Sequence, residues 1–435
     1  MKKEKLTLQQ KLDRRKAKLP NRFCYFLYWF IMTKIVMRKY NPHVVVKDKL
    51  PKKGACFIIW NHLSRLDHAY ICKAAYPRKI NIIAGYNEFF RSHLHFAFRL
   101  MRITPKMNWG TDLAGLRKMN SLIKQGACIT FSPEGMSSIY GTNQPVVAGT
   151  ARFLKKYRIP VYFMKMKGQY LTATKICLDE RYGRTEAELS LLWTPEQLDQ
   201  MSNEEIDTKL NELFRHDEYD WAKEIGIKWK HKGNELAKQL DSMLYKCPKC
   251  GHEMEMETEG NIIRCSHCGN GATANDYYQL EPLNKDCKIF ESPSKWATWE
   301  REEVIKEIRK DKNFSLSFHC RLGYLPPYKY VSKKQTTEPC GDGIFSVDHE
   351  GVHFRGTKLG QPYNVDISYN TIFSPSIVTD TTRFGIYIHD EYHEFYPDNW
   401  QYVGKTLLAV EEMHRLHVNY WKNFPWNDTM YPKEK

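Results

Sequence analysis

Short apolar runs alternate with amphipathic stretches along the first half of the chain. The runs are rich in β-branched and aromatic residues, a composition typical of β-strands. They lie at residues 43–48, 55–60, 81–85, 127–131, 159–164 and 188–193. Amphipathic stretches that predict helices lie between several of them, for example at 111–125. Because strands that alternate with helices form parallel sheets covered on both faces, residues 41–244 predict one α/β domain with a mostly parallel sheet flanked by helices.

The last part of the chain has a different pattern. From Gly341 onward, alternating runs predict several β-strands, and residues 401–420 predict a helix with one apolar face. This order is similar to that of pleckstrin-homology or GRAM-like modules, so residues 341–435 are expected to form a β-rich domain with a C-terminal helix. Residues 281–340 are expected to be a linker that contains a helix at 295–310.

Residues 1–40 combine a basic segment with an apolar and aromatic run at 23–37. The run is shorter than the roughly 20 residues that a helix needs to cross a bilayer. Basic residues flank it on both sides, a composition that favours an amphipathic helix lying in the head-group layer of a membrane. A core helix packed on the neighbouring domain fits the same run, and the pattern leaves both interpretations open.

Composition narrows the class of protein. The chain has 435 residues, of which 42% are hydrophobic and 27% charged, and this excludes disordered and fibrous classes. A formal net charge of +16 favours an anionic partner: phospholipid head groups, an acidic carrier protein or nucleic acid. Eight of the twelve cysteines are scattered rather than arranged as a disulfide framework, which predicts a reducing, cytoplasmic location.

A candidate catalytic pair follows the strand expected at 55–60. His62 comes just after the strand end, and Asp67 follows five residues later. Across a strand-to-helix turn, the carboxylate can bind one imidazole nitrogen and leave the other to take a proton from a hydroxyl. The same residues also fit a helix cap, with Ser64 as the N-cap residue and Asp67 in the first turn.

A second polar loop follows the strand expected at 127–131, and it contains Glu134, Gly135 and Ser138. The carboxyl ends of parallel strands meet at one edge of a sheet, so this loop is expected near His62. Its backbone N–H groups can bind a phosphate or an oxyanion. A plain Pro-Gly turn fits the loop as well.

The two loops share their order and spacing with the motifs of a known family. The residues that carry the likeness are Asn61, His62 and Asp67 in the first loop and Phe131, Pro133, Glu134 and Gly135 in the second. They resemble the glycerophospholipid acyltransferase family, which includes the 1-acylglycerol-3-phosphate acyltransferases. The resemblance covers about residues 20–200. It implies an O-acyltransferase in which His62 is the general base and Asp67 orients it.

The resemblance also implies the substrates. The acyl donor would be acyl-CoA or acyl-carrier protein, and a basic surface is compatible with an acidic carrier. The acceptor would be a hydroxyl of a lysophospholipid or of glycerol phosphate. Lys106 would contact the acceptor phosphate, and Asn61, Glu134, Gly135 and Ser138 would help to bind the acceptor.

Two departures from the family pattern concern phosphate recognition. The family commonly has Thr-Arg-Ser after the Glu-Gly pair, but this chain has Met136, Ser137 and Ser138 there, so the arginine is missing. Lys106 replaces the more usual arginine, which grips a phosphate with two parallel hydrogen bonds. Other arginines that could compensate are Arg99, Arg102 and Arg152.

Two closely spaced cysteine pairs predict a metal site within residues 245–280. Cys247-x2-Cys250 and Cys265-x2-Cys268 are separated by fourteen residues, the arrangement of a four-cysteine zinc ribbon. Four thiolates leave no open coordination position, so the Zn²⁺ is expected to be structural. A zinc ribbon in a basic chain also suits a nucleic-acid binder, but four glutamates between the pairs would repel phosphates, so no nucleic-acid partner is expected.

Together these features predict a cytoplasmic, peripheral acyltransferase on the inner face of the cell membrane, in contact with anionic phospholipid. Two alternatives remain open. One is a non-catalytic lipid-binding scaffold on a degenerate acyltransferase fold. The other is a zinc-ribbon protein that binds nucleic acid.

Overall fold

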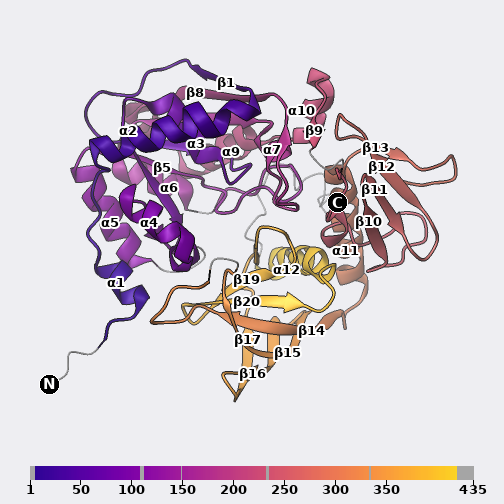
Figure 1. Cartoon of the computed structure of the whole chain (residues 1–435). Helices are drawn as coiled ribbons and strands as arrows, with labels where there is room; N and C mark the ends of the chain where they lie inside the picture. The colour runs from indigo at the N-terminus through magenta and orange to yellow at the C-terminus, as the bar shows by residue number, and fades with distance from the viewer. Residues whose placement is uncertain (1–4, 108–111, 148, 232–234, 333–334, 419–435) are drawn as a thin grey trace.

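The structure is a computed structural model that describes residues 5–107, 112–147, 149–231, 235–332 and 335–418. Two seven-stranded sheets, one four-stranded sheet and a two-stranded pair make up its β-structure. The first seven-stranded sheet and its helices lie on the left of Figure 1, the four-stranded sheet on the right, and the second seven-stranded sheet at the bottom.

The first sheet has the strand order β1-β8-β6-β2-β5-β3-β4. Its strands are β1 (Pro42–Val46), β2 (Cys56–Trp60), β3 (Ile80–Gly85), β4 (Thr104–Lys106), β5 (Cys128–Phe131), β6 (Val161–Lys167) and β8 (Thr185–Trp193). From β6 to β4 all neighbours run parallel. β8 is antiparallel to β6, and β1 is parallel to β8. The prediction of a mostly parallel sheet is confirmed.

Helices cover both faces of this sheet, as alternate residues of β2 show. Ile58 and Trp60 pack in a cluster with residues of α2 (Arg22–Phe30) and α3 (Asp67–Ala75). Phe57 and Ile59 pack in a second cluster. That cluster includes residues of α5 (Leu113–Lys124), α6 (Thr150–Tyr157), α8 (Pro195–Gln200) and α9 (Asn203–Phe214). Every residue of β2 is buried, so its end is anchored from both sides.

The other short elements of this half connect the strands or extend the domain. They are α1 (Leu8–Arg14), η1 (Ile31–Val36), η2 (Met37–Tyr40), η3 (Tyr86–Phe90), α4 (Ser92–Leu100), α7 (Gln169–Thr172), β7 (Arg181–Tyr182), α10 (Glu218–Ile225), β9 (Lys230–His231) and η4 (Leu240–Ser242). In the described residues, no helix is both long enough and apolar enough to cross a bilayer.

Antiparallel strands build the next two units. The four-stranded sheet consists of β10 (Met256–Glu259), β11 (Ile262–Cys265), β12 (Gly271–Ala274) and β13 (Leu280–Pro282). The second large sheet has the order β17-β16-β15-β14-β20-β19-β18. Its strands are β14 (Ser315–Tyr324), β15 (Glu338–Asp348), β16 (Val352–Lys358), β17 (Gln361–Ile367), β18 (Ser376–Ile377), β19 (Phe384–Ile388) and β20 (Glu391–Pro397).

The expected boundary of the C-terminal unit differs from the observed one. β14 lies in the middle of the second large sheet, although residues 281–340 were expected to be a linker. Its alternate residues, Leu316 to Leu322, are buried, so the strand is part of the core. α11 (Pro293–Lys310) and α12 (Tyr402–Val418) pack against each other. The last residues of the helix expected at 401–420 lie outside the described part of the chain.

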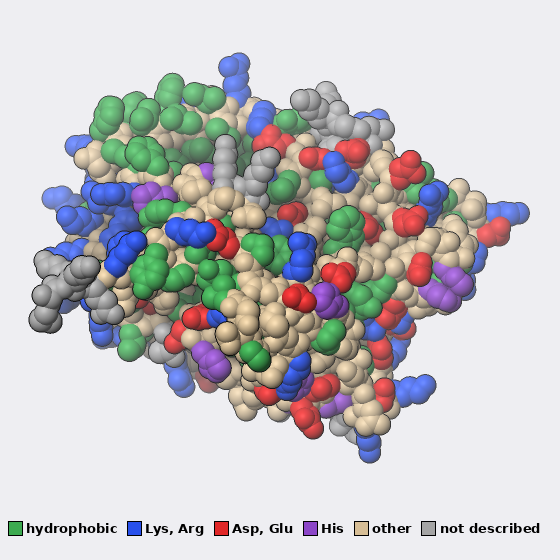
Figure 2. Space-filling model, turned by 60° about the horizontal axis from the view of Figure 1, so that its bottom comes forward, with side chains coloured by type: hydrophobic (Ala, Val, Ile, Leu, Met, Phe, Trp, Pro, Cys, Tyr) green, Lys and Arg blue, Asp and Glu red, His purple; other side chains and the backbone are tan. Residues whose placement is uncertain are grey.

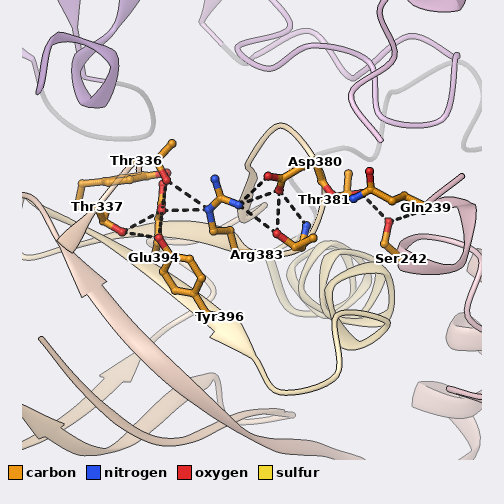
Figure 3. Close-up of polar contacts among 11 residues, drawn as sticks. Gln239, Ser242, Thr336, Thr337, Asp380, Thr381, Arg383, Glu394 and Tyr396 are labelled. Atoms are coloured by element: carbon orange, nitrogen blue, oxygen red, sulfur yellow. Dashed lines mark hydrogen bonds and ion pairs between the residues drawn. The ribbon is translucent and has the colours of Figure 1, made fainter. Parts of the chain in front are cut away.

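A buried polar network joins the C-terminal sheet to the rest of the molecule (Figure 3). Glu394 on β20 is fully buried and accepts hydrogen bonds from Thr336 at 2.5 Å and Thr337 at 2.9 Å. Arg383 binds Asp380 at 2.7 Å, and the backbone N–H of Asp380 donates to the carbonyl of Lys175 in the first domain at 2.8 Å. The turn between β18 and β19 therefore anchors the C-terminal unit to the α/β domain.

Candidate active site and candidate zinc site

His62 and Asp67 form a hydrogen-bonded pair at the end of β2. Nδ1 of His62 lies 2.8 Å from Oδ2 of Asp67. The Asp67 carboxylate also accepts the backbone N–H groups of Leu63 at 2.9 Å and Ser64 at 3.0 Å, and the Ser64 hydroxyl at 3.1 Å. Asp67 is buried, whereas 29% of the His62 side chain is exposed. The hydrogen bonds from Leu63 and Ser64 thus hold the carboxylate in place, and the carboxylate orients the imidazole. Nε2 of His62 is the ring nitrogen left to bind a reacting group.

The alternative interpretation of this turn as a capping box does not apply. α3 begins at Asp67, its N-cap residue is Leu66, and no side chain caps the helix. The Ser64 hydroxyl accepts the N–H of Leu66 at 3.1 Å instead of one further into the helix. Asp67 points back into the turn toward His62, the arrangement that a catalytic pair needs.

The second polar loop contacts His62 through its backbone. Oε2 of Glu134 accepts the N–H of His62 at 2.5 Å, and Oε1 accepts the N–H of Gln144 at 2.7 Å. The N–H of Ser138 donates to the carbonyl of His62 at 2.7 Å. Burial raises the pKa of Glu134 to about 8. The two loops that the sequence places at one sheet edge are therefore joined there, with His62 between them.

Three of the side chains expected to bind the acceptor form hydrogen bonds with other groups of the protein. Asn61 exchanges hydrogen bonds of 2.8 Å with both backbone groups of Met166 on β6. The hydroxyl of Ser138 donates to the carbonyl of Thr142 at 2.7 Å and accepts the N–H of Gly141 at 3.0 Å. Glu134 is buried with both oxygens bonded. In this structure these side chains hold the two loops around His62 in place and do not face an acceptor.

Gly135 lies in the Glu134 loop, whereas Lys106 lies at the end of another strand, β4. Gly135 has a φ of +71°, a conformation that favours glycine, so it shapes the turn after Glu134. Lys106 is exposed at the end of β4, three strands from β2 in the sheet order. Because neighbouring strands lie about 4.8 Å apart, roughly 14 Å separates the two strand ends. Lys106 thus lies at the correct edge but not beside His62.

Two of the arginines proposed as substitutes for the missing motif arginine lie close together. Burial and the nearby guanidinium groups of Arg102 and Arg99 lower the pKa of Arg15. Arg99 lies on α4, and Arg102 lies in the turn that leads to β4 and Lys106. Arg152 lies on α6, which covers the other face of the sheet. The sequence does not predict that Arg15, at the end of α1, lies near Arg99 and Arg102. This proximity depends on how the N-terminal segment packs.

One aromatic side chain lies near His62 and another near His68, the residue after Asp67. The rings of Trp60 and His62 have their centroids 6.2 Å apart, and Tyr28 on α2 lies 6.0 Å from the ring of His68. Burial lowers the pKa of His68, so it is neutral near pH 7. The sequence gives no signal for the Tyr28 contact, because it depends on α2 lying along α3.

The four cysteines of the expected zinc ribbon converge. Their sulfur atoms all lie within 4.8 Å of one another, with 3.7 Å between Cys247 and Cys268 and 3.8 Å between Cys250 and Cys265. Four thiolates bound to one zinc ion at about 2.3 Å would be about 3.8 Å apart, so the cluster fits tetrahedral Zn²⁺. Zinc bound here would cross-link the two knuckles.

Comparison with solved structures gives a likeness to an acyltransferase. No family model and no curated protein matches the sequence. Among solved structures, the chain is similar to the crystal structure of the 1-acyl-sn-glycerophosphate (LPA) acyltransferase, PlsC, from Thermotoga maritima. The match has 19% sequence identity and a TM-score of 0.34, and it covers 40% of this chain and 69% of that chain.

Proposed function

We propose that this protein is an O-acyltransferase that moves a fatty acyl chain from a thioester donor to a hydroxyl of a lysophospholipid or of glycerol phosphate. The observation that supports it is the His62–Asp67 pair at a sheet edge, with Nδ1 bound by a buried carboxylate and the ring partly exposed. The donor is acyl-CoA or acyl-carrier protein.

The chemistry follows from this geometry. Nε2 of His62 takes the proton of the acceptor hydroxyl as its oxygen attacks the thioester carbonyl. Asp67 stabilises the imidazolium that forms and keeps Nδ1 as the donor nitrogen. When the tetrahedral intermediate collapses, the C–S bond breaks and His62 returns the proton to the leaving thiolate. Neither an acyl-enzyme nor a metal ion is needed.

An apolar ridge on α2 and η1 supports action at a membrane surface. Its side chains are all exposed: Phe23, Phe26, Leu27, Phe30, Ile31 and Ile35. Tyr25, on the opposite face of α2, is buried against the domain, so the helix has both a packed and an exposed apolar face. Figure 2 shows hydrophobic side chains gathered on the left of the molecule, with Lys and Arg beside them. Such a surface fits the interface of an anionic bilayer.

A non-catalytic lipid-binding scaffold is the second candidate function. Ser137 in place of the motif arginine, and the internal bonding of Asn61 and Ser138, favour it. The test is incubation of the purified protein with acyl-CoA or acyl-carrier protein and a panel of lysolipids, followed by mass spectrometry of the lipids. Formation of a diacyl product supports the acyltransferase, whereas vesicle binding without turnover supports the scaffold.

A further inference from the structure

A cavity of about 560 Å³ lies behind the Glu134 loop, and the chemistry proposed for His62 makes no use of it. Four segments line it: residues 140–145, the end of β6, residues 215–224 at and before α10, and the first half of α11. The volume falls in the range of small-molecule sites, about 300–1,000 Å³. Because α11 lies outside the α/β domain, the cavity exists only where the two parts of the chain meet.

Two lysines of β6 line the cavity without an ion-pair partner among the described residues. Lys165 and Lys167 lie directly opposite Glu188 and Glu186 on β8. Those glutamates are paired elsewhere, Glu188 with Lys47 at 2.7 Å and Glu186 with Arg184 at 2.7 Å. Burial, followed by the nearby charge of Lys167, lowers the pKa of Lys165, and the charge of Glu188 offsets this only in part. An anion bound between the two ammonium groups would stabilise their charged forms and so offset both causes of the lowered pKa.

Arg215 adds a third cation to this wall, and it too forms no ion pair within the described part of the chain. The fourth, Arg301, is neutralised by Glu411 and Glu412, each at 2.6 Å.

The acidic side chains that line the cavity offset these cations only in part. Asp217 accepts the N–H of Tyr219 at 2.8 Å as the N-cap of α10, and Asp220 pairs with Lys295 at 3.3 Å. Glu224 lies exposed at the end of α10. Among the described residues, the three cations without an ion-pair partner outnumber the two acids without one, Asp217 and Glu224, so the cavity wall carries a net positive charge.

The cavity wall is also connected to the candidate active site. Gln144 lines the cavity, and its backbone N–H donates to Glu134, which in turn accepts the N–H of His62. On β6, the lysines flank Met166, whose backbone binds Asn61. A ligand in the cavity would thus contact segments that position the catalytic loops.

We propose that this cavity binds a phosphate-bearing ligand, with Lys165, Lys167 and Arg215 as its cationic contacts. The nucleotide part of a CoA thioester, a glycerol phosphate and free inorganic phosphate share this chemistry. The proposal depends on the cavity and its charges, and it stands whether or not His62 catalyses acyl transfer.

Binding to the purified full-length protein tests the proposal without turnover. Isothermal titration calorimetry would use CoA, dephosphorylated pantetheine, glycerol 3-phosphate and inorganic phosphate. The test variant is Lys165→Gln/Lys167→Gln, and a charge-matched control is Lys285→Gln/Lys312→Gln, two exposed lysines outside the cavity. At least one phosphate compound should bind the wild type, with an affinity that the cavity variant lowers at least tenfold and the control variant leaves unchanged.

The pattern of ligands identifies the source of the phosphate. CoA binding without pantetheine binding assigns the cavity to the donor, glycerol 3-phosphate binding assigns it to the acceptor, and binding of all three phosphate compounds alike makes it a small-anion site. The proposal is overturned if none of them binds the wild type, or if the cavity variant binds as tightly as the wild type. His62→Ala should bind as the wild type does, which separates this result from any failure of the proposed acyl transfer.

Discussion

The side chain of Glu134 accepts the backbone N–H of His62 at 2.5 Å, although 72 residues separate the two in the chain. Glu134 also accepts the N–H of Gln144, so one buried carboxyl group connects the loop that contains His62 to the loop after β5. This position explains why a glutamate follows β5. The Glu134 side chain holds the backbone of His62 in place and need not touch a substrate.

The raised pKa of Glu134 makes its contribution to stability depend on pH. The pKa rises from 4.5 in the unfolded chain to about 8 in the fold, so the folded state keeps a proton that the unfolded state loses between these values. Stability contributed by this group is therefore present below pH 4.5 and is lost as pH rises toward 8.

The variant Glu134→Gln removes this titration and also one hydrogen-bond acceptor. It should be less stable than the wild type at pH 5, and the difference should shrink by about 3.5 kcal/mol by pH 8. Chemical unfolding of both proteins across this range measures the difference. A constant gap between the two curves would show that Glu134 does not titrate in this window.

The variant Asp67→Asn should separate the contribution of Asp67 to orienting the imidazole from its contribution to folding. The amide is nearly the same size, but it does not enforce Nδ1 as the donor nitrogen of His62. We expect kcat to fall about 10³-fold with little change in KM. Circular dichroism should show an intact fold, because the Oδ1 position still accepts backbone N–H groups. A variant with more than a tenth of the wild-type kcat would argue against an orienting role.

The zinc site should be structural. Cys265→Ser should reduce the zinc content, measured by elemental mass spectrometry, from about one ion per chain to near zero and lower the melting temperature. Cys287→Ser, at a partly exposed cysteine outside the cluster, should change neither quantity. Full zinc content in Cys265→Ser would mean that the metal is bound elsewhere.

The apolar ridge should mediate membrane binding. Phe23 and Ile35 are 72% and 60% exposed, and inserting each into a bilayer would gain about 1.5–3 kcal/mol. Phe23→Asp/Ile35→Asp should therefore weaken binding to anionic vesicles at least tenfold in a sedimentation assay, with no change in melting temperature. Leu359→Asp, at a residue 61% exposed in the C-terminal unit, is the matched control. Equal losses in both variants would contradict a role for the ridge.

Much of the site could be predicted because parallel strands bring their ends to one edge. That rule alone predicts that His62 and the Glu134 loop lie close together. The roles of Asn61 and Ser138 could not be predicted, because their partners Met166 and Thr142 are fixed by tertiary packing.

The boundary of the C-terminal unit could not be predicted for a similar reason. The alternation in β14 is regular, but only its pairing with β15 and β20 shows that the strand lies at the centre of the sheet. The cavity behind Glu134 likewise depends on α11 approaching the α/β domain from a later part of the chain.

The central claim is that His62 takes the proton of the acceptor hydroxyl, and initial rates of acyl transfer test it most directly. His62→Ala would be compared with the wild type and with His43→Ala, an exposed histidine on β1 at the far edge of the sheet. We predict that kcat falls about 10³-fold in His62→Ala and stays unchanged in His43→Ala. A His62→Ala rate within tenfold of the wild type, in a folded protein, would contradict the account.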